Sequence, residues 1–245
     1  MYGRSSMWLT AVMAVTALAS AGGQVKKDSM GSGMGMASGK PMGAMDRDAA
    51  EYTIVYKSMW MPASHPFEYP SASLVSGPHF SGIIGAAHNA SYAIFKPGAM
   101  PTPGLERLSE QGKHSPLDEE ITAAVKAGNA ASLFASGPLK DFKDSLVVVF
   151  RVDPKHPMVS FVAMIAPSPD WFAGAADVSL WENGQWVGSR TIQVYAYDSG
   201  GDDGATYKAA DVDNNPKKPT TQAMTRHFAP NGTAIPVAMV TITRK

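Results

Sequence analysis

From residue 51 onward, the chain is dominated by short segments in which apolar and polar side chains alternate. In YTIVYK (52–57) the alternation places Tyr52, Ile54 and Tyr56 on one side of an extended strand. Later segments are rich in Val, Ile and aromatic residues, and Gly, Pro, Asn and Asp separate them. They are SYAIF (91–95), SLVVVFRV (145–152), MVSFVAMIA (158–166), DVSLWE (177–182), QWVGS (185–189), TIQVYAY (191–197) and AIPVAMVTIT (234–243). This pattern predicts about eight short β-strands.

One insertion in this series has a helical pattern. PGLERLSEQG (103–112) predicts a short helix, and SPLDEEITAAVKAG (115–128) predicts a better specified one. In the second, Ser115 is expected as the N-cap, Pro116 at the first helical position and Gly128 at the end. Acidic residues in its first turn would interact favourably with the positive end of the helix dipole.

Asn183-Gly184 gives the strongest hairpin signal in the chain, because both central residues of such a turn need positive φ. Short strands, one helical excursion and no internal repeat predict an all-β fold, an antiparallel β-sandwich with one short helical insertion. Residues 51–245 are expected to form this single domain.

The first fifty residues have a different character. Arg4, the apolar run MWLTAVMAVTALA and the small residues at 19–21 predict a cleavable signal peptide over residues 1–21. Residues 22–50 are rich in Gly, Ser and Met and predict a flexible tether. Its methionines leave two interpretations open, a low-complexity leader or a Cu(I)-binding segment. They are Met30, Met34, Met36, Met42 and Met45.

Composition excludes several functional classes. The 245 residues carry a formal net charge of zero, which argues against nucleic acid as the partner. With no cysteine there is neither a disulfide framework nor a cysteine nucleophile. The six histidines form no i, i+4 pair, and no catalytic motif is present. His79 and His88 could meet as ligands or as a base, but satisfied structural histidines are the favoured interpretation. We therefore expect a protein that is not an enzyme.

Three aspartates follow the predicted strand 191–197 in the loop YDSGGDDG. Asp198 comes directly after the strand, and Asp202 lies four residues on, with glycines between them that let the chain curl. Two interpretations stay open here, a solvated turn or a Ca²⁺ site built from hard oxygen ligands. Asp170, in the proline-stiffened segment APSPDWFAG, is the best candidate for a further ligand.

A second acidic segment, DVDNNPKKPTTQ (211–222), begins like a calcium-binding loop. It lacks the glycine and the final Glu that such a loop needs, since Pro216 and Gln222 stand in their places. We expect a solvated loop in which Lys217 and Lys218 partly balance the charges of Asp211 and Asp213.

Several of these stretches together resemble the spondin domain, the module found in mindin and F-spondin. They are YKSMWMPASHPFEYP, PHFSGIIGAAHN, SFVAMIAPSPDWFAG, YDSGGDDGATY and NNPKKP, in the family's order. The resemblance implies an antiparallel β-sandwich like the calcium-dependent lipid-binding sandwiches. It also implies a Ca²⁺ ion held by Asp170, Asp198 and Asp202, with Asp203 outside the pattern. Because animal members carry cysteines and further modules that are absent here, we expect a bacterial single-domain member.

The function implied is that of a secreted, periplasmic or surface-exposed calcium-binding module for adhesion or recognition. It would bind an extracellular protein or glycan through a surface around Trp171 and Phe172, whose alternative role is core packing. Two other hypotheses stay open, calcium-dependent association with a membrane surface through those aromatics and copper handling through the Met-rich tether. The sequence leaves the oligomeric state open.

Overall fold

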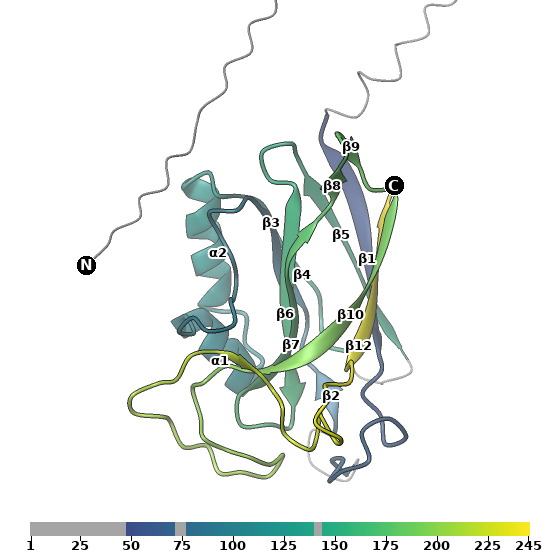
Figure 1. The fold of residues 1–245 in the computed structure, drawn as a ribbon. Helices are drawn as coiled ribbons and strands as arrows, with labels where there is room; N and C mark the ends of the chain where they lie inside the picture. The colour runs from purple at the N-terminus through teal and green to yellow at the C-terminus, as the bar shows by residue number, and fades with distance from the viewer. Residues whose placement is uncertain (1–47, 72–76, 140–143) are drawn as a thin grey trace, which may run out of the picture. The chain divides into compact units, whose positions relative to one another are not determined.

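The strands with alternating sequences form one layer of the fold in the computed structural model, which describes residues 48–71, 77–139 and 144–245 (Figure 1). The layer runs in the order β5 (Ser145–Val152), β1 (Ala50–Ser58), β12 (Ala238–Arg244) and β10 (Ser189–Asp198). All neighbours are antiparallel, and Ile54 of β1 lies opposite Val148 and Ile242. Alternate residues of β5 are buried and exposed, as the sequence pattern predicts.

The second layer has at its centre β3 (Ile84–His88) and β6 (Met158–Ala166), which are buried on both faces. It contains β7 (Trp171–Ser179), β6, β3 and β4 (Ala130–Ala135), again antiparallel. Eight of the nine residues of β6 are buried, which explains why its sequence is a nearly continuous apolar run. Short strands complete the described set: β2 (His79–Phe80), β8 (Trp181–Glu182), β9 (Gln185–Trp186) and β11 (Thr221–Gln222).

Strand β10 belongs to both layers. Its first part, from Ser189 to Val194, pairs with β12. Its last part, from Tyr195 to Asp198, pairs with β7. The strand therefore crosses from one layer to the other and ends beside the start of β7. This arrangement confirms the predicted all-β antiparallel sandwich.

The helical insertion contains α1 (Pro103–Gln111), which lies against β6, and α2 (Leu117–Lys126), which lies against β4. Thr102 caps α1 by accepting from the backbone N–H of Leu105 at 3.2 Å. Helix α2 begins at Leu117, one residue later than the sequence predicts from Pro116. Pro116 occupies its N-cap position and gives no side-chain cap, so the predicted role of Ser115 is wrong.

Two hydrophobic clusters hold these layers together. The larger one lies between the two sheet layers and includes Tyr52, Ile54, Phe150, Phe161 and Val240. The smaller one lies between the second layer and the helices. It contains Ile84, Ala86, Ile94, Phe95, Leu105, Leu108, Leu117, Ile121, Ala124, Ala130, Val162 and Phe172. Covering the second layer by helices thus accounts for the burial of its other face.

Local patterns misplaced some strands. SYAIF (91–95) is not a strand, although Ile94 and Phe95 are buried beneath the helices. Strands β3 and β4 were not predicted. Every residue of β3 is buried, so its sequence lacks the alternation that marks a half-exposed strand, and the burial of β4 does not alternate regularly. The Asn183-Gly184 hairpin is confirmed: both residues have positive φ, and Trp181 pairs with Trp186 across the turn.

The predicted signal peptide and nearly all of the tether lie outside the described residues. Within the part that the structure describes, no helix is long and apolar enough to cross a membrane.

A buried histidine gives a testable pH dependence. His65 is 1% exposed, and burial lowers its pKa to about 4, from an ordinary value of 6.5. Between these values the unfolded chain binds the proton more readily than the folded one. The stabilising effect of neutral His65 is therefore complete above pH 6.5 and is lost as the pH falls toward 4.

We expect the stability advantage of the wild type over His65→Gln to shrink steadily from pH 6.5 to pH 4. Urea unfolding of both proteins at several pH values measures this difference. Equal pH slopes for the two proteins in this range would contradict the assignment.

Candidate functional site

The ends of β10 and the start of β7 bring two predicted ligand residues together. Asp198, the last residue of β10, lies opposite Trp171, the first residue of β7. Asp170 directly precedes Trp171, so antiparallel pairing places the two aspartates next to each other. They lie at the end of the sandwich where long loops gather (Figure 1).

Asp170 is fully buried, and one of its carboxylate oxygens organises the loop after β10. Oδ2 accepts hydrogen bonds from the Ser199 hydroxyl and from backbone N–H groups of the same loop. These are the N–H groups of Gly200 and Gly201, each at 2.9 Å, and of Asp202 at 3.2 Å. The other oxygen, Oδ1, is buried and has no hydrogen-bond partner among the described residues. Burial raises the pKa of Asp170, and the loop hydrogen bonds oppose this shift.

Asp198 contributes a second carboxylate to the same place. Its Oδ1 accepts from the backbone N–H of Gly200 at 2.9 Å, the same N–H that donates to Asp170. Burial and the neighbouring charge of Asp170 raise the pKa of Asp198 to about 6. Two adjacent carboxylates with raised pKa values form a site whose electrostatic repulsion a bound cation would relieve.

The third predicted ligand, Asp202, has a different orientation. Its Oδ1 accepts from the backbone N–H of Gly204, and its Oδ2 from that of Val212 at 2.6 Å. The carboxylate therefore fixes the loop that runs from 202 to 212. Within the described ranges, no group of three or more Asp, Glu or His side chains is placed to hold a metal ion. Of the three predicted ligands, Asp170 and Asp198 lie next to each other, whereas both carboxylate oxygens of Asp202 accept hydrogen bonds from its own loop.

Helix α1 brings a carboxylate that sequence reasoning missed. A Cβ added at Gly201 would lie 2.8 Å from Glu110 Oε1, an oxygen that is buried and has no hydrogen-bond partner. Burial, followed by the charges of Glu106, Asp213, Asp211 and Asp170, raises the pKa of Glu110 to about 7. The helical pattern could not reveal that Glu110 lies beside the aspartate loop, because it marks Glu110 only as a polar position.

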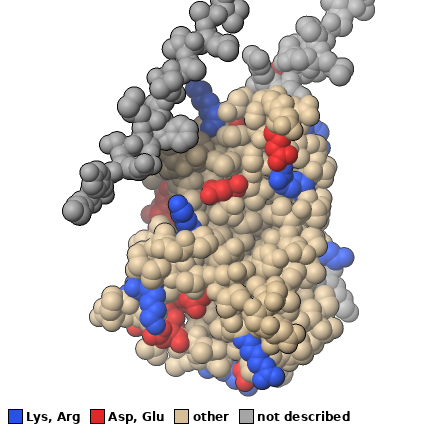
Figure 2. All heavy atoms as spheres, viewed as in Figure 1, with Lys and Arg blue, Asp and Glu red and all other residues tan. Residues whose placement is uncertain are grey.

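The acidic side chains around Glu110 gather on one face beside α1 (Figure 2). Lys217 and Lys218 do not pair with the aspartates that the sequence analysis assigned to them. Lys217 pairs with Glu106 and Lys218 with Asp203, so Asp211 and Asp213 are not their partners in the structure. Asp203 is exposed and pairs with Lys218, and its charge makes a small contribution to the raised pKa of Asp198.

The aromatic residues after Asp170 do not form a surface. Trp171 and Phe172 are both 0% exposed. Trp171 packs against Tyr207 and Phe228, and Phe172 against Phe95. The idea that these two rings contact a partner or enter a membrane is therefore wrong, and core packing is their role.

Two histidines that the sequence analysis singled out, His79 and His88, lie apart in the structure. His88 is buried, and its Nε2 lies 2.7 Å from the Ser160 hydroxyl, which is also buried. His79 lies on β2 across from Ala166, away from this pair. His88 and His79 thus do not meet, and the Ser160 hydroxyl is closed to a substrate.

Comparison with known proteins shows which family the chain belongs to. Residues 50–234 match the family model Spondin_N. The chain belongs to this family. Spondin-2 of Rattus norvegicus is 30% identical over 195 residues, which are 77% of this chain and 58% of that protein. Spondin-2 of Homo sapiens is 29% identical over 192 residues, or 76% and 57% of the two chains.

Spondin-1 of Homo sapiens is 31% identical over 180 residues, which cover 70% of this chain and 21% of that protein. This spondin domain therefore spans less than two thirds of the length of the relatives it matches.

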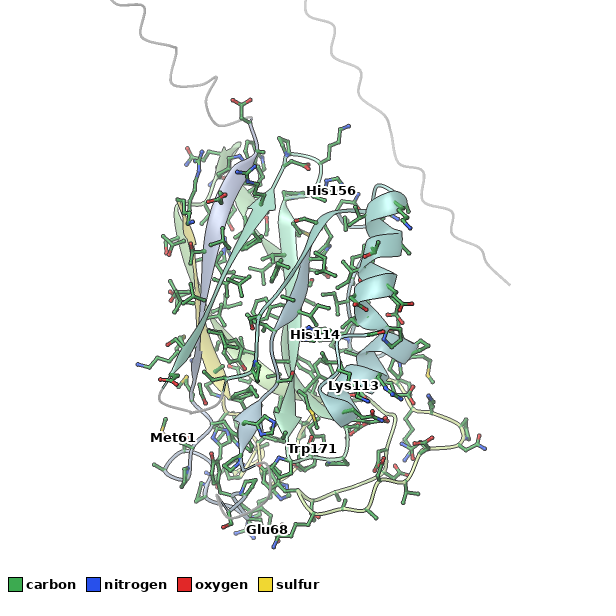
Figure 3. All side chains as sticks on the ribbon, turned by 180° about the vertical axis from the view of Figure 1, so that it is seen from behind. Met61, Glu68, Lys113, His114, His156 and Trp171 are labelled. Atoms are coloured by element: carbon green, nitrogen blue, oxygen red, sulfur yellow. The ribbon has the colours of Figure 1, made fainter. Side chains whose placement is uncertain are left out.

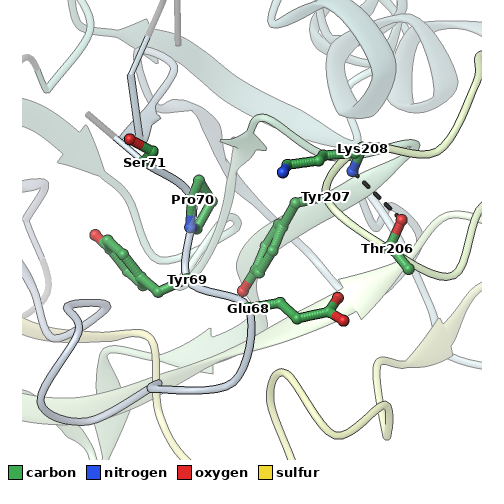
Figure 4. Close-up of a pocket in the computed structure, with 7 residues that line it drawn as sticks. All are labelled: Glu68, Tyr69, Pro70, Ser71, Thr206, Tyr207 and Lys208. Carbon is green, nitrogen blue, oxygen red and sulfur yellow. Dashed lines mark hydrogen bonds between the residues drawn. The ribbon is translucent and has the colours of Figure 1, made fainter. Parts of the chain in front are cut away.

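The same end of the spondin domain contains a cavity of about 410 Å³ (Figure 4). Glu68, Tyr69, Pro70 and Ser71 line one side of it, and Thr206, Tyr207 and Lys208 line the other. The indole N–H of Trp60 donates to Tyr207 Oη at 3.2 Å and fixes that wall. The cavity offers aromatic rings together with hydroxyl, carboxylate and ammonium groups.

Gly200 allows a test of how tightly the aspartate loop is built. It has φ +87°, and a Cβ added there would lie 2.1 Å from the Lys218 carbonyl oxygen. Gly98 has nearly the same φ, +86°, but open space around the Cβ position. Gly98→Ala should therefore cost about 1–2 kcal/mol for the left-handed backbone alone.

We expect Gly200→Ala to cost a further 1–3 kcal/mol or so, because of the steric clash. Chemical denaturation of the two variants measures the difference. Equal losses of stability would show that the loop can move away from the clash.

Proposed function

We propose that this spondin domain is an exported, non-catalytic recognition module whose loop end binds Ca²⁺. The observation that supports it best is the buried carboxylate pair of Asp170 and Asp198. Oδ1 of Asp170 has no partner within the described residues, and the pKa of both carboxyl groups is raised. Membership of the Spondin_N family supports the same proposal.

Hard carboxylate oxygens are the ligands that Ca²⁺ prefers, with six to eight oxygens in total. Asp170 and Asp198 would supply the first of them, and Glu110 would join from helix α1. Asp202 stays a predicted ligand that would have to exchange its bonds to Gly204 and Val212. Backbone carbonyls and water would fill the remaining positions.

Bound Ca²⁺ would neutralise the repulsion between these carboxylates and tie β10, β7 and α1 together. It would supply charge neutralisation and rigidity and would carry out no reaction. The loops at this end would then keep a fixed shape for a partner. The cavity beside Tyr69 and Tyr207 offers aromatic ring faces and hydrogen-bonding groups. An extracellular protein or a glycan would bind there by packing on the rings and by forming hydrogen bonds.

The proposal includes the organisation of the chain. A signal peptide over residues 1–21 would direct export, residues 22–50 would act as a tether, and residues 51–245 would form the recognition domain. The mature protein would be secreted, periplasmic or attached at the cell surface.

Calcium should stabilise the folded protein by mass action. For a dissociation constant on the order of 10⁻⁴–10⁻³ M, 10 mM Ca²⁺ should add about 1.4–2.7 kcal/mol and raise the melting temperature by roughly 3–10 °C. Asp198→Asn should remove most of this shift, as should Asp170→Asn if that variant folds. Differential scanning calorimetry with and without Ca²⁺ measures the effect.

Asp203→Asn is the matched control, because Asp203 lies in the same loop but is exposed and pairs with Lys218. It should keep the full calcium response. Asp202→Asn decides whether Asp202 becomes a ligand. Loss of the calcium response would show that Asp202 binds the ion, and an unchanged response would show that it only holds the loop. A wild-type melting temperature that 10 mM Ca²⁺ leaves unchanged would rule out the proposed site.

Recognition through the loop end should depend on both calcium and the cavity. On immobilised glycans and extracellular proteins, the wild type should show binding that a calcium chelator weakens about tenfold or more. Tyr69→Ala should weaken the same binding while leaving the calcium-induced shift of melting temperature unchanged. Binding that neither the chelator nor Tyr69→Ala alters would place the recognition surface elsewhere.

A further inference from the structure

A second cavity, separate from the carboxylate site, is lined by two histidines and a methionine. Its volume is about 400 Å³. His79 reaches it from β2, Met164 from β6, and His114 from the loop after α1. Figure 3 shows His114 beside the helices. The other lining residues are Ser81, Gly82, Gln111, Gly112, Ser136 and Pro138.

Both histidines have one ring nitrogen held by a backbone carbonyl. His79 Nδ1 lies 2.9 Å from the Gly77 carbonyl oxygen, and His114 Nε2 lies 3.0 Å from that of Gly82. Since a carbonyl oxygen can only accept, each of these nitrogens carries the proton. In the neutral rings, His79 Nε2 and His114 Nδ1 therefore keep their lone pairs. This is the arrangement that orients a histidine as a metal ligand.

The thioether of Met164 lies beside the same loop. Met164 is 8% exposed, and a Cβ added at Gly112 would lie 3.3 Å from its Sδ. Gly112 ends α1 in a left-handed conformation, two residues before His114. On the sheet side, β2 pairs with β6 so that His79 lies opposite Ala166, two residues from Met164 and on the same face. Three side chains of ligand-forming type thus line one cavity from three segments.

The chemistry of the cavity selects the kind of metal. None of its described lining residues is a carboxylate, so a hard cation such as Ca²⁺ or Mg²⁺ has no anionic ligand there. Imidazole nitrogens suit copper and zinc, and a thioether favours Cu(I). We propose that His79 Nε2, His114 Nδ1 and Met164 Sδ form a Cu(I) site. This site depends neither on the proposed calcium function nor on the Met-rich segment.

The test is a competition for Cu(I) between the full chain and a chromogenic Cu(I) chelator under reducing conditions. Relative to the wild type, His79→Gln/His114→Gln should bind Cu(I) at least about 10–100-fold more weakly. Met164→Leu keeps the side-chain volume and should remove the sulfur contribution from the copper X-ray absorption spectrum of the domain site.

Two controls separate this site from other copper binding. His156→Gln should leave the affinity unchanged, because both ring nitrogens of His156 are already engaged, by Asp153 and by the Gly128 carbonyl. Met34→Leu/Met36→Leu removes thioethers from the Met-rich segment and should leave the affinity of the domain site unchanged. Melting temperatures of all variants show whether each one folds.

Unchanged Cu(I) affinity in the folded His79→Gln/His114→Gln variant would overturn the proposal. Loss of Cu(I) binding in Met34→Leu/Met36→Leu alone would assign copper to the Met-rich segment instead. Binding of Zn²⁺ without binding of Cu(I) would also overturn it, since the thioether would then have no role.

Discussion

The carboxylate of Asp170 determines the shape of the loop that follows β10. A buried carboxylate is strongly destabilising unless hydrogen bonds compensate it. Here Oδ2 accepts from the Ser199 hydroxyl and from three successive backbone N–H groups, those of Gly200, Gly201 and Asp202. The same hydrogen bonds that satisfy Oδ2 therefore fold the loop around it. Asp202 fixes the next part of the loop, because its carboxylate accepts hydrogen bonds from the backbone N–H groups of Gly204 and Val212.

The crossing of β10 between the two sheet layers makes that interaction possible. Pairing with β12 fixes the start of the strand and pairing with β7 fixes its end, so Asp198 must emerge beside Asp170. The loop hydrogen bonds stabilise the charge only in part, since Asp170 Oδ1 has no partner among the described residues and the pKa of Asp198 is raised to about 6. In the proposed site, a bound cation would compensate the negative charge that these hydrogen bonds leave uncompensated.

Helix α1 links the two proposed metal sites. Its apolar side packs on the second sheet layer through Leu105 and Leu108. That packing directs Glu110 toward Gly201 and the buried aspartates, and it carries Gly112 over the sulfur of Met164. The two sites differ in their ligands, carboxylates in one and imidazole and thioether groups in the other. The two sites are therefore expected to select different metals, although α1 contributes to both.

The sequence by itself determined the alternating strands β1, β5 and β12 and the Asn183-Gly184 hairpin. It also singled out Asp170 and Asp198, which the structure places next to each other. Each follows from a local pattern or a resemblance along the chain. Only the tertiary structure placed Glu110 beside Gly201 and turned Asp202 toward its own loop. It also buried strands such as β3, whose sequence shows no alternation. Local patterns report which face of a single element is apolar. Contacts between elements distant in the chain depend on how the layers and helices pack.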